Sequence, residues 1–198
     1  AVPQIAAMLQ QTLLPFSVET EGRGYRPMRE IMLETLEQIE ARGQAAFEGK
    51  MLGVPTGYPE IDEHTNGFRD GEFVSIFAGP KQGKTAFTLA IAIHNSLNGQ
   101  GCGFVCAEMT RHALAERCLN AVGKIRTVET SRGLFTADNW KRVVETGGLV
   151  AGANNFFVDD EAFPELGDVI ARALHLKSQH PRLKLLVVDY LQLVTHRM

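Results

Sequence analysis

Short apolar segments alternate with longer amphipathic ones from residue 53 to the end of the 198-residue chain. The apolar segments are rich in β-branched or aromatic residues, which predicts strands at 73–77, 103–107, 156–158 and 183–188. The intervening segments predict helices over 84–97, from a cap at Thr110 through Val122, from a cap at Thr136, and up to His180-Pro181. Continuous apolar strands separated by helices indicate a parallel sheet covered by helices on both faces. The sequence therefore predicts an α/β fold.

The helix that begins after Thr136 is expected to bury one side against this sheet or its helices. Trp140, Val143 and Val144 are its largest apolar residues near the start, and we expect them to form the buried side.

The first 50 residues follow a different pattern. Residues 1–26 are weakly patterned, with one short amphipathic helix expected around Ile5, Met8, Leu9 and Leu13. A second helix is predicted over 28–42, with Met28, Met32, Leu36 and Ile39 on one face. The segment 49–53 resembles a linker, so we expect a boundary near residue 50. The apolar face of the second helix must dock, either on the core of the same chain or on a neighbouring subunit.

Composition excludes some classes of function. The chain has 20 Lys and Arg against 23 Asp and Glu, so its net charge of −3 argues against binding nucleic acid by bulk positive charge, although a local basic groove stays open. It has no apolar run of the roughly 20 residues that a membrane helix needs, and its N-terminus lacks the charged start of a signal peptide. Three cysteines, Cys102, Cys106 and Cys118, predict free thiols in a reducing compartment; their spacing disfavours a zinc site that would include His112.

A phosphate-binding loop is the strongest local motif. The run Ala78-Gly79-Pro80-Lys81-Gln82-Gly83-Lys84-Thr85 follows a predicted strand and opens a predicted helix, with Ala in place of the usual first Gly. Backbone N–H groups of such a loop point at phosphate oxygens, Lys84 reaches the β- and γ-phosphates, and the Thr85 hydroxyl ligates Mg²⁺. The expected nucleotide-binding residues are Ala78, Gly79, Pro80, Lys81, Gln82, Gly83, Lys84, Thr85 and Ala86. The plainer interpretation is an ordinary turn with an exposed lysine.

Acidic residues follow three of the predicted strands. Asp189 ends the apolar run 185–188 and fits a carboxylate that holds Mg²⁺ through water, opposite Thr85 at the same sheet edge. Glu108 could polarise the water that attacks the γ-phosphate, or it could be a strand-end acid beside a helix start. For Asp159, Asp160 and Glu161, a place near a helix start is favoured over a two-metal site, and Asp160 is the next candidate base after Glu108.

Four motifs in order resemble one known family. They are Gly53-Val54-Pro55-Thr56-Gly57-Tyr58 with Ile61-Asp62 and Thr65-Asn66-Gly67-Phe68, the phosphate loop with its Gly-Lys-Thr-Ala-Phe ending, Ala107-Glu108-Met109-Thr110, and Asp189-Tyr190-Leu191-Gln192-Leu193. Together they resemble the ATPase domain of replicative hexameric DNA helicases of the DnaB type. Where the family has Ser-Leu-Glu-Met, this chain has Cys-Ala-Glu-Met, a mild departure.

The resemblance implies a RecA-like ATPase domain over 51–198, with Glu108 and Lys84 as catalytic residues and with ATP and Mg²⁺ as cofactors. It implies a ring of six subunits that hydrolyses ATP at subunit interfaces and translocates on single-stranded DNA, with primase and a helicase loader as further partners. Residues 27–50 resemble the linker helix that docks on the next subunit, and residues 1–26 the end of an N-terminal domain. The cellular location that the resemblance implies is the cytoplasm of a bacterium or of a phage-infected host. The family's glutamine sensor strand, DNA-binding loops and arginine finger lie beyond the position of Met198, so we expect a fragment that binds nucleotide better than it hydrolyses it.

Two other functions use the same loop, Glu108 and Asp189. One is a RecA-like regulatory module that binds nucleotide and switches partners without unwinding DNA. The other is a loader or decoy that caps a helicase ring through the helix at 28–42. The run from Asp189 to Leu193 favours the helicase over the regulatory module.

Overall fold

The computed structural model describes residues 25–49, 51–162 and 164–189 of the chain. The chain divides into two units, Ala1–Lys50 and Met51–Met198, and each is described by itself. The short helix expected around Ile5 to Leu13 and the motif residues Tyr190 to Leu193 lie outside the described residues.

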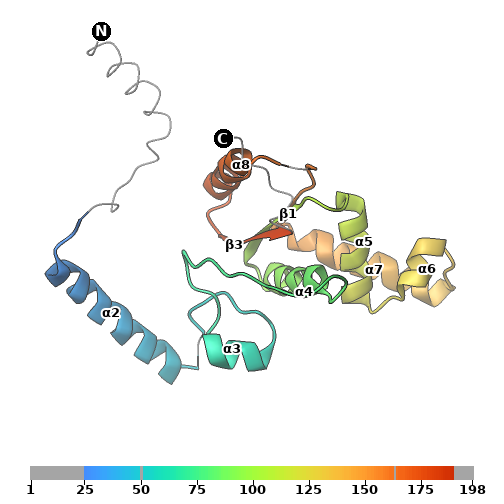
Figure 1. Ribbon diagram of the computed structural model, residues 1–198. Coiled ribbons are helices and arrows are strands. Elements are labelled where there is room, and N and C mark those ends of the chain that lie inside the picture. The colour runs from blue at the N-terminus through green and yellow to red at the C-terminus, as the bar shows by residue number, and fades with distance from the viewer. Residues whose placement is uncertain (1–24, 50, 163, 190–198) are drawn as a thin grey trace, which may run out of the picture. The chain divides into compact units, whose positions relative to one another are not determined.

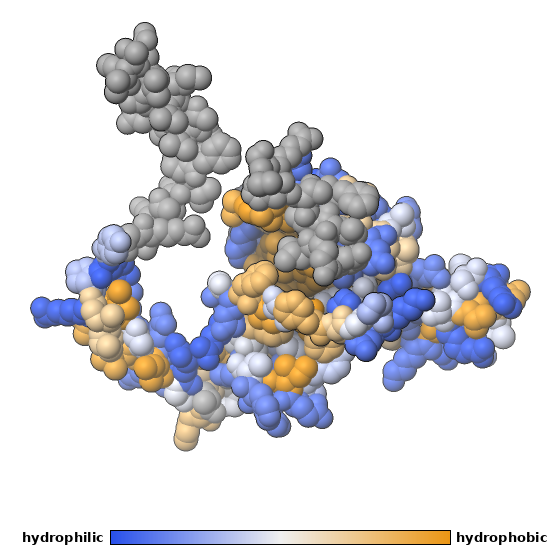
Figure 2. Space-filling model, viewed as in Figure 1, coloured by the Kyte–Doolittle hydropathy of each residue, from blue (hydrophilic) through white to orange (hydrophobic). Residues whose placement is uncertain are grey.

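The first unit contains a single described helix, α2 (Met28–Phe47). The helix predicted over 28–42 is confirmed and extends five residues further along the chain. At its start, Arg26 forms an ion pair with Glu34, with Nη2 2.5 Å from Oε1. Met28, Met32, Leu36 and Ile39 are each at least half exposed, and Figure 2 shows hydrophobic residues, in orange, on the surface of α2. Within the first unit, the apolar face of α2 is therefore exposed.

The second unit is built on a parallel sheet, which confirms the predicted α/β class. Within the described residues, the sheet has three strands in the order β2-β1-β3: β1 (Gly101–Cys106), β2 (Phe156–Asp159) and β3 (Leu183–Asp189). Both neighbours pair with β1 in parallel, and Phe104 is in register with Val158 on one side and Val187 on the other.

The described helices of this unit are α3 (Pro59–Thr65), α4 (Lys84–Leu97), α5 (Arg111–Gly123), α6 (Thr127–Arg132), α7 (Ala137–Ala153) and α8 (Leu166–Gln179). The sequence predicts α4, α5, α7 and α8 but not the short α3 and α6. The helices α5, α6 and α7 lie between β1 and β2, and α8 connects β2 to β3, whereas α3 and α4 precede β1. Both expected N-caps are confirmed. The Thr110 hydroxyl oxygen accepts from the Ala113 N–H at 3.3 Å, and that of Thr136 accepts from the Asn139 N–H at 3.2 Å. Each cap satisfies one backbone donor that the first helical turn leaves unpaired.

The two faces of the sheet are covered by different helices, with α4 on one side and α8 on the other (Figure 1). Alternate residues of β1 explain this arrangement, because successive side chains of a strand point to opposite faces. On the α4 side, the buried core joins Cys102, Phe104 and Cys106 to Leu89, Ala92 and Ile93 of α4. On the α8 side, a Cβ added at Gly103 would lie 3.3 Å from Leu176, so α8 closely approaches the strand there.

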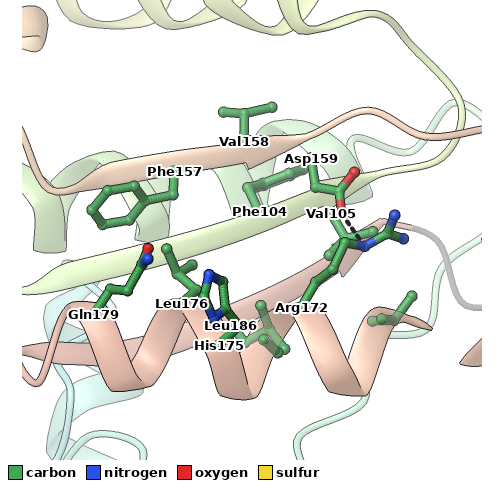
Figure 3. Close-up of a pocket in the computed structure, with 12 residues that line it drawn as sticks. Phe104, Val105, Phe157, Val158, Asp159, Arg172, His175, Leu176, Gln179 and Leu186 are labelled. Carbon is green, nitrogen blue, oxygen red and sulfur yellow. Dashed lines mark ion pairs between the residues drawn. The ribbon is translucent and has the colours of Figure 1, made fainter. Parts of the chain in front are cut away.

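A pocket of about 210 Å³ lies between α8 and the sheet. Phe157, Leu176 and Leu186 are among its lining residues, and Figure 3 shows the ion pair of Asp159 with Arg172 at one end. Its lining includes none of the phosphate-loop residues, nor Glu108 or Asp189.

The strand predicted over 73–77 is wrong, because residues 72–79 form no regular secondary structure. Phe73 and Phe77 are 81% and 89% exposed. Within the described part of the chain, no strand pairs with this segment. A β-strand needs a hydrogen-bonded neighbour to satisfy its backbone groups, and apolar composition alone does not supply one.

The predicted buried side of α7 is also partly wrong. Trp140 and Val144 are 55% and 57% exposed, and the Trp140 ring contacts Phe135 at a centroid distance of 5.5 Å. The packed side instead carries the buried Thr146, whose hydroxyl oxygen would lie 2.8 Å from a Cβ added at Gly123 of α5. The absence of a side chain at Gly123 therefore allows α5 to pack closely against Thr146 of α7.

Candidate functional site

The course of α4 brings the phosphate loop to one edge of the sheet. Three residues separate the end of α4 at Leu97 from the start of β1. Near that helix end, the Ser96 hydroxyl donates to the Asn155 side chain at 2.6 Å, just before β2 begins. A helix of this length spans about 21 Å, close to the length of a six-residue strand. The start of α4, with Lys84 and Thr85, therefore lies at the opposite edge, where the parallel strands end.

The sequence-predicted acids lie at this same edge. Asp189 ends β3 and is in register with Cys106, the last residue of β1. One residue further on, the Ala107 N–H donates to the Asp189 carbonyl oxygen at 2.9 Å, and Glu108 follows directly. The fold thus gathers the start of α4, Glu108 and Asp189 where the parallel strands end.

The phosphate loop is closed by its own side chains. The ammonium of Lys84 donates to the carbonyl oxygens of Ala78 at 2.8 Å and Gly79 at 3.1 Å. The Gln82 side-chain oxygen accepts from the Gly79 N–H at 2.8 Å. Gly83 caps α4 with φ of +87°, a conformation that L side chains rarely adopt. Ala78, Pro80, Lys81, Gln82, Gly83 and Ala86 are exposed, whereas Gly79, Lys84 and Thr85 are partly buried.

Asp189 carries an acceptor that the described residues leave unused. The residue is 5% exposed, and among residues 25–49, 51–162 and 164–189 its buried Oδ2 atom has no hydrogen-bond partner. Buried polar atoms are nearly always paired, and a buried carboxylate without a partner is costly. This atom fits a cation site, because a hydrated Mg²⁺ would supply the missing partner.

Glu108 is an exposed side chain on a firmly held backbone. Ala107 before it is buried, and Met109 after it packs against the core that β1 shares with α4 and α5. Thr110 then caps α5. The carboxylate is free to meet water at the sheet edge, which is what a general base requires.

Asp160 is engaged by Arg111, a residue that the sequence analysis missed. The Asp160 carboxylate accepts from the Arg111 backbone N–H at 2.8 Å and from its Nε at 2.8 Å, and it also contacts Nη2. The side-chain and backbone hydrogen bonds from Arg111 lower the pKa of Asp160 to about 2. Arg111 stands in the first turn of α5, where the helix dipole disfavours a cation. This unfavourable position was the sequence signal that an acidic partner is near.

The acids on either side of Asp160 pair with a different arginine, Arg172. Arg172 of α8 pairs with Asp159 at 3.0 Å and also contacts Glu161. No group of three or more His, Cys, Asp or Glu side chains suited to a metal ion is found within residues 25–49, 51–162 and 164–189. The three cysteines are free and buried, and burial raises the pKa of Cys102 to about 12 and that of Cys118 to about 11.

The residues of the first motif fasten the chain to α4. The buried Asp62 accepts from the Thr56 N–H at 2.8 Å and the Gly57 N–H at 3.1 Å. Asn95 of α4 donates to the Pro55 carbonyl oxygen at 2.7 Å. The Tyr58 ring packs on Phe87, in the first turns of α4, with centroids 4.9 Å apart. These contacts hold the helix that carries the phosphate loop.

Within the described part of the chain, no helix has the length and hydropathy needed to cross a bilayer.

Comparison with known proteins gives one consistent group. Residues 53–198 match the family model described as the DnaB-like helicase C terminal domain. Replicative DNA helicase DnaB of Geobacillus stearothermophilus is 28% identical over 183 residues, which covers 92% of this chain and 39% of the relative. Replicative DNA helicase DnaB of Leifsonia xyli subsp. xyli is 32% identical, covering 88% and 38%. The chain thus spans about two fifths of the length of these relatives.

Two solved structures share the fold. One of them, described as an ATPase domain, superimposes with a TM-score of 0.76 at 26% identity and covers 87% of this chain and 60% of that one. A DnaB-like replicative helicase, studied with its interactions with primase, has a TM-score of 0.74 at 25% identity and covers 98% and 48%. Together with the parallel sheet, these matches confirm the RecA-like architecture that the sequence predicts.

Proposed function

Since the chain belongs to the DnaB-like helicase C-terminal domain family, we propose that it is the motor part of a replicative DNA helicase. It binds ATP with Mg²⁺ at the sheet edge where α4 begins and β1 and β3 end. The observation that carries this proposal is the buried Oδ2 atom of Asp189, which has no hydrogen-bond partner in the described part of the chain and lies at that edge with Glu108 and the phosphate loop.

Each residue of the edge has a distinct role in this proposal. Lys84 exchanges the carbonyl oxygens of Ala78 and Gly79 for oxygens of the β- and γ-phosphates. The Thr85 hydroxyl and, through water, the Asp189 carboxylate hold Mg²⁺. Glu108 accepts a proton from the water that attacks the γ-phosphorus. ATP would supply the γ-phosphoryl group: its bond to the β–γ bridging oxygen breaks as the water adds, and ADP leaves with that oxygen.

The loop that leads into α4 binds the phosphates by its backbone. The residues from Ala78 to Ala86 surround the turn at Gly83, and the N–H groups of Lys84, Thr85 and Ala86 lie in the first turn of α4, where the helix dipole favours an anion. The present contacts of Lys84 and Gln82 with the loop must open for this binding.

We further propose that six copies form a ring that hydrolyses ATP at subunit interfaces and moves on single-stranded DNA. The exposed apolar face of α2, within residues 27–50, supports docking on a neighbouring subunit, because an open apolar stripe of this kind favours a partner. Primase and a helicase loader are proposed partners. The structure of a similar helicase with its primase interactions supports the first of them. The proposed location is the cytoplasm of a bacterium or of a phage-infected host.

The substitution Glu108→Gln tests the chemistry. The amide keeps the shape of the side chain but accepts no proton, so ATP turnover should fall by about 10²–10⁴-fold while nucleotide affinity persists. The measurements are steady-state hydrolysis and binding of a fluorescent ATP analogue, with the protein expressed from its complete gene. Glu145→Gln on α7 removes an exposed charge away from the edge and serves as the control. Turnover of Glu108→Gln close to the parental rate would overturn the assignment.

Fork unwinding tests the wider proposal. The protein expressed from its complete gene should unwind a forked DNA substrate in the presence of ATP, and its Glu108→Gln variant should bind the same fork without opening it. Hydrolysis by the parent with no unwinding and no stimulation by single-stranded DNA would instead indicate a regulatory nucleotide-binding module.

A further inference from the structure

We propose that the Arg111–Asp160 pair positions Glu108 for catalysis, an inference that rests on the proposed role of Glu108 as the base. Arg111 and Asp160 are positioning residues, because their side chains bind each other. They act on the chemistry through the short segment that carries Glu108.

The segment around Glu108 is fixed on one side by β3. The Ala107 N–H donates to the Asp189 carbonyl oxygen at 2.9 Å, and Ala107 is buried. This bond continues the β1–β3 ladder by one residue beyond Cys106. It leaves the backbone after Ala107 free to turn toward α5.

The same segment is fixed on its other side by β2, through Asp160. Asp160 directly follows β2, whose last residue, Asp159, is in register with Val105 of β1. The Asp160 carboxylate holds the start of α5 twice, by the Arg111 backbone N–H and by its guanidinium. Glu108 therefore stands in a span whose two ends are tied to the two outer strands of the sheet.

The character of the pair suits a positioning role. The Asp160 side chain is 15% exposed, and both of its oxygens bind Arg111: Oδ2 accepts from the backbone N–H and Oδ1 from the guanidinium. Such two-point pairs fix geometry as well as charge. The next acid along the chain, Glu161, contacts Arg172 of α8 at a half-exposed site and has no bond to α5 among the described contacts. It provides a matched comparison within the same loop.

Displacing a catalytic base strongly lowers the reaction rate. A displacement of about 1 Å from the productive geometry can reduce a rate by on the order of 10²-fold even when substrate binding survives. If Asp160 holds the start of α5, its loss should let residues 108–110 move relative to β1. Turnover should then fall without a matching loss of nucleotide affinity.

The experiment measures kcat and nucleotide affinity for Asp160→Ala, Arg111→Ala and Glu161→Gln in the protein expressed from its complete gene. We expect Asp160→Ala to lower kcat by about tenfold or more, with the dissociation constant of a fluorescent ATP analogue unchanged within about twofold. Arg111→Ala should have a smaller effect, because Asp160 still accepts the backbone N–H. Glu161→Gln should match the parent.

A double-substitution cycle identifies the route of the effect. In a Glu108→Gln background the base is already lost, so adding Asp160→Ala should cause little further decrease in kcat. Hydrogen exchange provides a readout besides activity. The amides of residues 108–113 should exchange faster in Asp160→Ala and at the parental rate in Glu161→Gln. If Asp160→Ala fails to fold, the same measurements on Arg111→Ala test the proposal.

The outcomes separate this inference from the proposed function. If Glu108→Gln lowers turnover but Asp160→Ala and Arg111→Ala do not, the positioning role is overturned and the proposed base stands. An equal loss from Asp160→Ala in both backgrounds, or a parallel loss of nucleotide affinity, also overturns it. Full turnover by Glu108→Gln itself would instead overturn the proposed function.

Discussion

The backbone N–H of Ala107 donates to the carbonyl oxygen of Asp189 at 2.9 Å. This bond joins the ends of two neighbouring parallel strands at the residue before Glu108 and at the proposed metal-holding acid. The proposed base and the proposed Mg²⁺ carboxylate are therefore set by one piece of backbone, and a change in the pairing of β1 with β3 would move both.

Replacing Lys84 with Ala should remove most of the nucleotide affinity. The ammonium is the only lysine charge held inside the described loop, where it contacts Ala78 and Gly79. A hydrogen bond to a charged group contributes about 1.5–3 kcal/mol, so the dissociation constant of a fluorescent ATP analogue should rise on the order of tenfold to hundredfold. Lys141→Ala, an exposed lysine of α7, is the control. Equal affinity in Lys84→Ala would contradict the phosphate-loop assignment.

Replacing Asp189 with Asn should remove most of the Mg²⁺ dependence of ATP binding. The neutral amide is a poorer ligand for a hydrated cation than a carboxylate. Affinity measured with Mg²⁺ should fall toward the value in EDTA, whereas affinity in EDTA should not change. The unfolding free energy of the nucleotide-free protein should not decrease, because the substitution removes a buried carboxylate oxygen without a partner. An undiminished Mg²⁺ effect would argue that another group holds the cation.

Stability should fall in acid through Asp160. The hydrogen bonds from Arg111 lower the pKa of Asp160 from 3.8 to about 2 in the folded chain. The stabilisation is present above the unfolded value, and it is lost as the pH decreases from about 4 to about 2. The urea midpoint should decline over this range in the parent, and part of that decline should be missing in Asp160→Asn. Parallel curves for the two proteins would count against the pair.

The thiols of Cys102 and Cys118 should resist alkylation in the folded protein. Burial raises their pKa values to about 12 and about 11, so little thiolate is present at pH 8, and access is blocked as well. Mass spectrometry after iodoacetamide treatment should find these cysteines unmodified in the native state and modified after denaturation. Native labelling as fast as in urea would show that the core opens readily.

Local patterns predicted much of the fold. Capping residues such as Thr110 act within four residues of their partners, and the phosphate-loop spacing reflects one short stretch of backbone, so both can be read from sequence. The strand prediction for residues 73–77 was wrong because a strand needs a distant pairing partner, which the composition of the segment does not identify. The prediction for Trp140 was wrong because α7 approaches α5 closely at Thr146, opposite Gly123, a contact that the apolar pattern of α7 does not reveal.

The candidate site shows the same division. The nearness of Glu108 to Asp189 was predictable because parallel strands end at a common edge. The position of Arg111 at a helix start indicated an acidic partner but not which acid, since only the folded sheet brings α5 close to Asp160. An isolated acid next to a strand gives no indication of which cation will reach it.

The order β2-β1-β3 has a consequence for the nascent chain. The central strand is synthesised first, yet Cys102 finds its neighbours only at Phe156 and Leu185. Ribosomes add roughly 5–20 residues per second, so β1 waits on the order of seconds for each partner. During that time its apolar residues depend on local helices, above all α4, for protection from aggregation. Loss of early packing between α4 and β1 should therefore reduce the yield of folded protein before it affects the finished site.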